Sequence, residues 1–401
     1  MMIRRLLTTF IAAGLLLAGC SEDKKKETPP YVPPARAVQT HLMYMPWSDN
    51  LTDYFRVNID DMASVVAKGL DDGVRVLVFF MESSGTATLF EMYREGGTCK
   101  RRTIKSYSAP IDFTSAAGIA SILGDVKSEA PADRYTMSIG SHGMAWLPVV
   151  SLARAQMRAA VPQRREYWEY AAEDRPLTRW FGGVSTAHRT EIQTLADALT
   201  QAGMHMDYIL FDDCYMSSVE VAYALRHVTD YLIGSTSEIM AYGFPYALAG
   251  EHMLGEVDYE GICDAFHNFY STYEFPYGTI GITRCAELDD LADIMRRINA
   301  SCTFDTTTVD ELQRLDGYTP TLFFDLGDYV RHLCTDPALL DEFEQQLALT
   351  VPWHRHTEYY YSMANGRNPI YTYSGITTSD PSIDPEIVID RRHTAWYEAT
   401  H

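Results

Sequence analysis

YTMSIGSHGMAW (residues 135–146) begins as an apolar, extended run and breaks at Gly140, after which His142 lies in a turn-forming segment. A second run, MDYILFDDC (residues 206–214), is also largely apolar and ends on two acids and Cys214. Short apolar runs bounded by turn residues are typical of strands that are buried on both faces of a parallel sheet. Each predicted strand therefore delivers a chemically reactive side chain at its carboxyl end.

The segments around these two strands alternate between extended and helical patterns. We expect further strands at 38–47, 74–81 and 230–238, and helices at 48–70 (capped by Ser48), 115–129, 190–202 and 217–227 (capped by Ser217 or Ser218). The runs on either side of Gly96-Gly97 predict a hairpin at one edge of the sheet. Strand–helix–strand repetition implies an α/β fold, with a mainly parallel sheet between helices.

The second half of the chain has a more mixed pattern. We expect helices at 259–273, 287–299 and 322–334, a strand at 279–284, and an aromatic-rich, loop-like end. The expected organisation is a core domain at 37–250, interrupted by an irregular, arginine-rich insertion at 147–189, and an α/β extension of the same unit at 251–401. The chain has 401 residues, of which 46% are hydrophobic, so a large core is expected.

Charge and the N-terminus limit the partners and the location of the chain. The net charge of −21 argues against binding to nucleic acid or to an anionic membrane surface. Residues 1–19 hold two arginines and a short apolar run, the pattern of a secretory signal peptide. The run ends in Leu-Ala-Gly-Cys and resembles a bacterial lipobox, which implies a lipid anchor at Cys20 and sorting to the outer membrane; plain secretion is the alternative. Residues 20–36 predict an extended tether.

His142 and Cys214 suit nucleophilic catalysis. In open parallel sheets, ligands bind beyond the carboxyl ends of the strands, where both residues are expected. An imidazole can take the proton of a thiol, and the N-terminus of the following helix favours a thiolate. Gly143 lets the backbone approach a substrate, so its N–H and that of Cys214 are candidates for an oxyanion hole. Taken singly, a loop histidine or a buried cysteine is more often structural.

The ordered combination resembles the cysteine peptidases of clan CD, and within that clan the clostripain family. The similarity lies in SHGMAW, YILFDDCYMSSVEVAYALR and YLIGSTSEIMAYGFPY, and near the end in YSGITTSDPS and TAWYEATH. It implies a caspase-like fold and a cysteine endopeptidase that acts on protein or peptide substrates. By position, it makes Cys214 the nucleophile and His142 the general base and acid.

The resemblance also indicates which residues line the S1 pocket. Asp212 matches an acid that binds a basic P1 residue, although a strand-end carboxylate held by backbone amides is the alternative; Ser235 and Glu238 are further candidates. Many members of the family carry another acid in the pocket loop, where this chain has Ala241-Tyr242. The expectation of a basic P1 residue therefore depends on a single carboxylate, that of Asp212. A smaller or apolar P1 residue is the alternative.

Three further expectations stay open. Some relatives mature by cleavage between the histidine and cysteine strands, and Arg164-Arg165 lies there; an uncut insertion is the alternative. No metal motif is present, so no metal ligand and no cofactor are predicted, although members of this family can use calcium. An inactive or binding surface lipoprotein on the same fold is the alternative function, because a fold does not determine an activity.

Overall fold

The central feature of the molecule is a nine-stranded sheet with the order β10-β8-β7-β6-β5-β1-β2-β3-β4. Its strands are β1 (Ala37–Met45), β2 (Val74–Ser83), β3 (Thr86–Glu95), β4 (Thr98–Ser108), β5 (Ala132–Gly140), β6 (Met206–Asp212), β7 (Thr229–Gly234), β8 (Thr279–Arg284) and β10 (Trp353–His356). The five strands in the middle of the sheet, β7-β6-β5-β1-β2, are parallel, and antiparallel strands flank them on both sides. The expected α/β fold with a mainly parallel sheet is confirmed.

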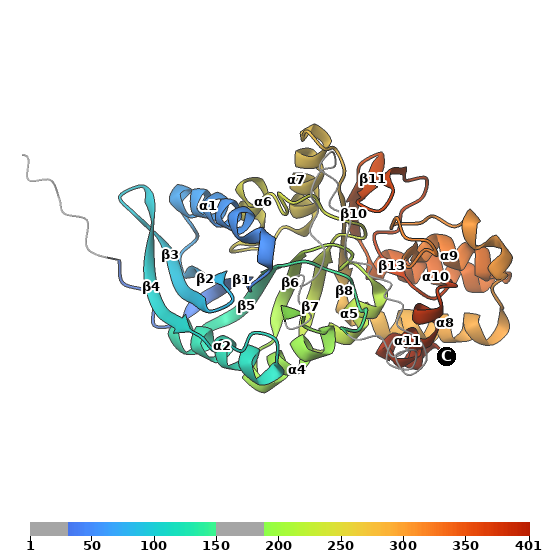
Figure 1. Cartoon of the computed structure of the whole chain (residues 1–401), viewed down its shortest axis with the longest axis horizontal. Coiled ribbons are helices and arrows are strands. Elements are labelled where there is room, and N and C mark those ends of the chain that lie inside the picture. The colour runs from blue at the N-terminus through green and yellow to red at the C-terminus, as the bar shows by residue number, and fades with distance from the viewer. Residues whose placement is uncertain (1–30, 150–187) are drawn as a thin grey trace, which may run out of the picture. The chain divides into compact units, whose positions relative to one another are not determined.

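Helices cover both faces of this sheet (Figure 1). In the part of the chain that the structure describes, the helices up to residue 301 are α1 (Thr52–Lys68), α2 (Ala116–Glu129), α4 (Ile192–Ala202), α5 (Val219–Leu225), α6 (Tyr246–Met253), α7 (Tyr259–Thr272) and α8 (Leu288–Ser301). Helices α1, α6 and α7 pack side by side on one face, whereas α2, α4 and α5 lie on the other. Both faces of the central strands are thereby covered, which explains why β2 is buried at seven consecutive positions from Arg75 to Met81.

The computed structural model describes residues 31–149 and 188–401, and Tyr31–His401 form a single unit by their contacts. The predicted signal peptide (1–19), Cys20 and the Arg164-Arg165 pair of the insertion lie outside the described residues. Among the described helices, none combines the length and the apolar character needed to cross a membrane.

The C-terminal part adds short elements around the sheet. They are β9 (Phe324–Asp325), α9 (Leu326–Leu333), α10 (Pro337–Thr350), β11 (Tyr359–Ser362), β12 (Gly366–Pro369), β13 (Thr377–Thr378), α11 (Pro385–Asp390) and α12 (Ala395–Thr400). The prediction of a loop-like end is therefore wrong. Strands β11 and β12 pair as a hairpin, and β13 pairs with β9. The predicted helix at 322–334 is present as α9, whereas the 14-residue helix α10 was not predicted. The two-residue strands leave too short a periodic pattern to be recognised in a single sequence.

Other local predictions can be compared with the structure. The hairpin at Gly96-Gly97 is confirmed, because both glycines have a positive φ between β3 and β4. The predicted cap of the first helix is wrong: Ser48 precedes a 3-10 turn, η1 (Asp49–Leu51), and its hydroxyl donates to the Pro46 carbonyl. The predicted tether (20–36) extends too far towards the C-terminus, because Tyr31 already packs on the folded part. Its ring stacks on Tyr93, with 4.3 Å between the ring centroids.

A buried ion pair joins β2 to β3 near the edge of the sheet. Arg75 donates to both carboxylate oxygens of Glu91, at 2.7 and 3.0 Å, and both side chains are 1% exposed or less. Burial raises the pKa of Glu91, but hydrogen bonds from Arg75, Arg102 and Tyr31 outweigh this effect and hold it below its usual value. A carboxylate whose pKa is depressed by folding stabilises the fold at pH values above its ordinary pKa. This contribution is lost as the pH falls towards the depressed pKa.

We predict that Glu91→Gln lowers the free energy of unfolding by about 3–5 kcal/mol at about pH 7, because Arg75 keeps a buried, uncompensated charge. The loss should shrink at about pH 4, because Glu91 of the unfolded wild-type chain then binds protons that the folded pair does not, and the pair contributes less to stability. Urea denaturation of both proteins at the two pH values measures the difference. Glu95→Gln, at the hairpin end of the same strand, serves as the control and should change stability little. A pH-independent loss would contradict the assignment.

Candidate active site

Strand pairing places the two predicted catalytic residues at the same level. In the parallel pair β5–β6, Gly140 lies opposite Asp212. His142 follows Gly140 by two residues, and Cys214 follows Asp212 by two residues. The loops that carry the imidazole and the thiol therefore leave the sheet side by side at its carboxyl edge. On the other side of β5 lies β1, from which the chain continues to β2 in the opposite direction along the sheet, so the site is at a topological switch point.

Gly143 brings these two loops into contact. A Cβ atom at this position would lie 2.2 Å from the Cys214 carbonyl oxygen and 2.9 Å from the Cys214 nitrogen. Such distances are below any normal contact, so only glycine fits without movement of the backbone. The expected approach of this backbone to a substrate stays a prediction; in the structure, it is the backbone of Cys214 that comes close to Gly143.

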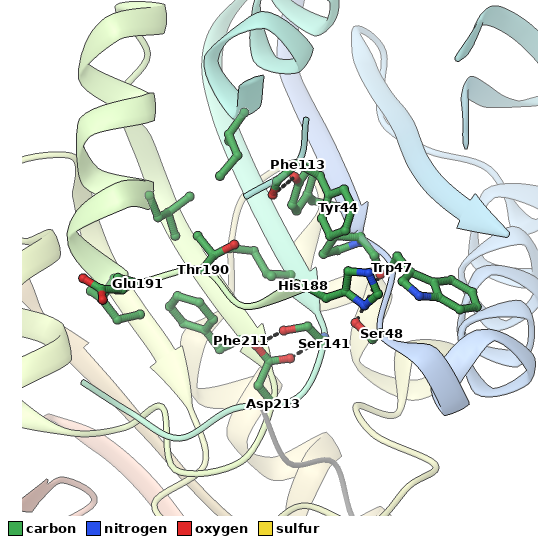
Figure 2. A pocket seen from close by; sticks show the side chains of 15 residues that line it. Tyr44, Trp47, Ser48, Phe113, Ser141, His188, Thr190, Glu191, Phe211 and Asp213 are labelled. Atoms are coloured by element: carbon green, nitrogen blue, oxygen red, sulfur yellow. Dashed lines mark hydrogen bonds between the residues drawn. The ribbon is translucent and has the colours of Figure 1, made fainter. Parts of the chain in front are cut away.

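Asp213 also ties the same two loops together. Its carboxylate accepts hydrogen bonds from the backbone N–H of Ser141, at 2.5 Å, and from the Ser141 hydroxyl, at 3.1 Å. Figure 2 shows this pair at the edge of a pocket between the strand ends and α4. The lining residues are Tyr44, Pro46, Trp47, Ser48, Phe113, Ile119, Ile139, Ser141, His188, Thr190, Glu191, Ile192, Leu195, Phe211 and Asp213. Neither His142 nor Cys214 lines this largely apolar pocket.

The imidazole of His142 has a partner on a third strand end. Its Nε2 lies 2.8 Å from Oδ1 of Asn50, which belongs to the η1 turn after β1. The side chain of His142 is buried, with 2% of the residue exposed. Consecutive sheet neighbours β1, β5 and β6 therefore contribute Asn50, His142 and Cys214, respectively.

Cys214 is fully buried, and its sulfur accepts a hydrogen bond from the backbone N–H of Ile239 at 3.3 Å. The residue after it, Tyr215, has a φ of 63°, and Ala145 in the histidine loop has a φ of 52°. Non-glycine residues rarely adopt this conformation, and such strain is commonly found at functional sites. Tyr215 is held in it by a hydrogen bond to the Ser237 carbonyl and by stacking on Phe323, 5.0 Å between ring centroids.

Asp212 lies on the face of the sheet that α1, α6 and α7 cover. It is fully buried, and its Oδ1 accepts a hydrogen bond from the backbone N–H of Phe244 at 2.7 Å. The strand-end carboxylate is thus held by a backbone amide of the pocket loop, as the structural alternative expected. This contact also places the acid directly beside the Gly243-Phe244 part of that loop.

The pocket loop is held from its other side by helix α1. Asn58 donates to the carbonyl of Tyr242 at 3.0 Å, and the Tyr242 hydroxyl donates to Asp61 at 2.6 Å. Burial, more than any other influence, raises the pKa of Asp61. Where the sequence lacks an acid at Ala241-Tyr242, a carboxylate from a distant helix therefore contacts the loop.

Glu238 and Ser235, which were predicted to contact the substrate, make hydrogen bonds inside the protein. The Glu238 carboxylate accepts hydrogen bonds from the hydroxyls of Tyr215 and Ser362, at 2.9 and 2.6 Å, and from the backbone N–H of Met363. Ser235 hydrogen-bonds with Thr279 at 2.8 Å. Both residues are at most 4% exposed. Their polar groups are used inside the protein, where Glu238 joins the nucleophile loop to the β11–β12 hairpin.

The C-terminal segment makes hydrogen bonds to both predicted catalytic loops. The backbone N–H of Thr377 donates to the Ser217 carbonyl at 3.0 Å, and the Trp146 indole donates to the Ser379 hydroxyl at 3.0 Å. Glu220 accepts the backbone N–H of Ser379 at 2.7 Å. Burial and the neighbouring carboxylate of Asp380 raise the pKa of Glu220. Both predicted catalytic loops are therefore held by residues that come more than 150 positions after Cys214.

Metal binding has no counterpart in the described residues. Within 31–149 and 188–401, no three His, Cys, Asp or Glu side chains come together in a way that could hold a metal ion. The six cysteines in these ranges are all free thiols.

Sequence reasoning missed Asn50, Asp213, Asn58 and Asp61 as parts of the site. Asn58 and Asp61 lie in an amphipathic helix whose pattern indicates packing alone. Asn50 sits in a turn that the sequence assigned to the same helix. Only the position of Asp213, beside Cys214 at a strand end, carried a signal, and the sequence could not show that its partner is Ser141.

The chain is similar in sequence and fold to known proteins. A profile of the Clostripain family matches residues 166–315. A search of proteins with curated descriptions found no match. Among solved structures, a secreted C11 cysteine protease of Bacteroides thetaiotaomicron, "iotapain", is 52% identical; the match covers 91% of this chain and 100% of that chain, with a TM-score of 0.82.

Two further structures extend this similarity. A clostripain from Bacteroides thetaiotaomicron, solved with the peptide inhibitor BTN-VLTK-AOMK, is 58% identical over 55% of this chain and 99% of its own, with a TM-score of 0.54. An inactive zymogen C11 protease from Parabacteroides distasonis is 28% identical over 92% of this chain and 100% of its own, with a TM-score of 0.76. The chain belongs to the clostripain (C11) family of cysteine peptidases.

Proposed function

We propose that Cys214 and His142 carry out peptide-bond hydrolysis in this chain. The observation that carries the proposal is the contact of Gly143 with the backbone of Cys214, which brings the histidine loop against the nucleophile loop. A thiol and an imidazole on adjacent strand ends are the groups that nucleophilic acyl transfer needs. The peptide inhibitor bound by the 58% identical clostripain supports a peptide as the substrate class.

The proposed reaction has two steps. The Cys214 sulfur adds to the scissile carbonyl carbon while His142 takes the thiol proton, and the N–H groups of Gly143 and Cys214 bind the resulting oxyanion. The C–N bond then breaks, and His142 gives its proton to the leaving amine. Water attacks the thioester with His142 as the base, which releases the acid product and restores the thiol. Each step uses groups of the chain itself and draws on no cofactor.

A basic P1 residue is the specificity that we propose. Asp212 lies beside the Gly243-Phe244 loop, and Asp61 adds a second carboxylate behind Tyr242. In the inhibitor of the related clostripain, the residue next to the AOMK group is lysine. A positively charged P1 side chain bound beside this loop would be attracted by both carboxylates, which favours Lys or Arg.

We also propose that the chain is exported and anchored by lipid at Cys20, with outer-membrane sorting as the proposed destination. The apolar run before Cys20 and its lipobox-like end support this location. The 52% identical relative is described as secreted, which agrees with export.

We predict that Cys214→Ala lowers kcat/KM by at least about 10³-fold, because the nucleophile is lost. Fluorogenic peptides that vary at P1, assayed under reducing conditions, measure the effect, and intact mass shows whether the active species is cut between 147 and 189. The control is Cys302→Ala, a partly exposed thiol after α8, which should keep wild-type turnover. Equal turnover by Cys214→Ala would refute the proposed nucleophile, and a wild-type chain without any turnover would favour a binding function.

Gly143→Ala should lower kcat by about 100-fold or more, since the added methyl group displaces the histidine loop from Cys214. Gly124→Ala is the matched control: a Cβ at that helical position in α2 meets nothing within 4 Å. Single-turnover rates on the best P1 substrate measure both variants. A fully active Gly143→Ala protein would contradict the close approach of the two loops.

Asp212→Asn tests the S1 pocket. The change keeps an oxygen for the Phe244 amide but removes the charge, so kcat/KM for Lys or Arg at P1 should fall about 10- to 100-fold. Turnover of peptides with Leu or Ala at P1 should change far less. Asp207→Asn, on the same strand β6, is the control. Uniform loss on all substrates would assign Asp212 to the structural role alone.

A further inference from the structure

Asn50 lies in the turn that follows β1, beside the loop that carries His142. The η1 turn follows β1, and β1 pairs in parallel with β5, the strand that delivers His142. Tyr44 lies opposite Ile139 in this pair, so the chain leaves β1 next to the point where it leaves β5. The two loops therefore run together at the carboxyl edge of the sheet.

Buried neighbours set the position of Asn50, although Asn50 itself is exposed. Leu51 and Phe55, which follow it, are each 1% exposed. Phe55 packs against Gly140: a Cβ there would lie 3.1 Å from the Phe55 ring and 2.4 Å from the Met45 sulfur. The turn is thereby docked on the residue that ends β5, and the Asn50 amide reaches His142 from this fixed base.

The donor and the acceptor of this hydrogen bond can be assigned. The amide oxygen Oδ1 of Asn50 lies 2.8 Å from Nε2 of His142, and an amide oxygen only accepts hydrogen bonds. Nε2 must therefore carry the proton, which leaves Nδ1 as the nitrogen that can take the proton of a thiol. The same bond becomes stronger when the ring is an imidazolium, because its N–H is then charge-assisted.

We propose that Asn50 is a positioning residue for the reaction: it holds the His142 ring and selects the tautomer with the basic nitrogen at Nδ1. The inference rests on the proposed function, since it assigns a partner to the general base of the Cys214–His142 pair. Asn50 acts through the imidazole in both reaction steps, as it orients the base in the first and stabilises the protonated ring that follows.

Charged groups near the ring bear on its protonation. The adjoining strand end of β6 carries Asp212 and Asp213, whose carboxylates accept hydrogen bonds from Phe244 and Ser141, respectively. The thiol of Cys214 lies on the same strand end, and Glu238 is bonded to Tyr215 beyond it. Asn50 contacts the ring itself, so replacing it acts on the imidazole without removing any of these charges.

Two substitutions separate a positioning role from a merely structural one. Asn50→Ala removes the acceptor and should lower kcat about 10- to 100-fold with KM changed less than about twofold, because a misoriented base affects the chemical step. Asn50→Asp keeps an acceptor oxygen and adds a charge, so it should retain more activity than Asn50→Ala. A carboxylate beside an imidazole favours the protonated ring, so both limbs of the pH–rate profile should move up by about one pH unit.

The measurements are steady-state kinetics across pH and thermal unfolding of the full chain. Asp53→Ala, whose side chain is 93% exposed one turn further along, is the matched control and should match wild type in both. Unchanged kcat in Asn50→Ala, or an unshifted profile in Asn50→Asp, would overturn the inference. If one of these results is found while Cys214→Ala is inactive, the role of Asn50 is rejected but the proposed function is retained. Turnover by Cys214→Ala would reject the proposed function itself.

Discussion

The parallel pairing of β5 with β6 is the constraint on which the rest of the site depends. Gly140 and Asp212 lie opposite each other, so residues two positions further along both strands emerge together. The absence of a side chain at Gly143 then lets the loops touch, and the Ser141–Asp213 hydrogen bonds hold them together. A shift of the register by one residue would exchange the faces of the strand ends and separate His142 from Cys214.

Buried acids organise the surroundings of this pair. Glu238 and Glu220 each accept hydrogen bonds from segments far away in the sequence, from Ser362 and Ser379, respectively. Their partners lie in the C-terminal part of the chain, which explains why that part belongs to the same unit as the sheet. A carboxylate can join several backbone N–H groups and hydroxyls at one point, which apolar packing cannot do.

Much of the fold was predictable because its strands are continuous apolar runs and its longer helices are strongly periodic. Strands β1, β2, β5, β6 and β7 and helices α1, α2, α4 and α5 lie close to their expected ranges. In the C-terminal part, α9 lies within its expected range, whereas β9 and β13 were not predictable, since they have two residues each and depend on pairing with one another. The prediction that Ser48 caps the first helix was wrong, because the chain enters that helix through the η1 turn, without a side-chain cap from Ser48.

The sequence by itself determined the strands, the residues at their carboxyl ends and the family resemblance, because periodicity and short motifs are local properties of the chain. Tertiary structure alone decided the partners. Asn50 reaches His142 across 92 residues, Glu238 reaches Ser362 across 124, and Asp61 reaches Tyr242 across 181. A hydrogen bond at such a separation depends on how the sheet pairs and how the helices pack, which no local pattern encodes.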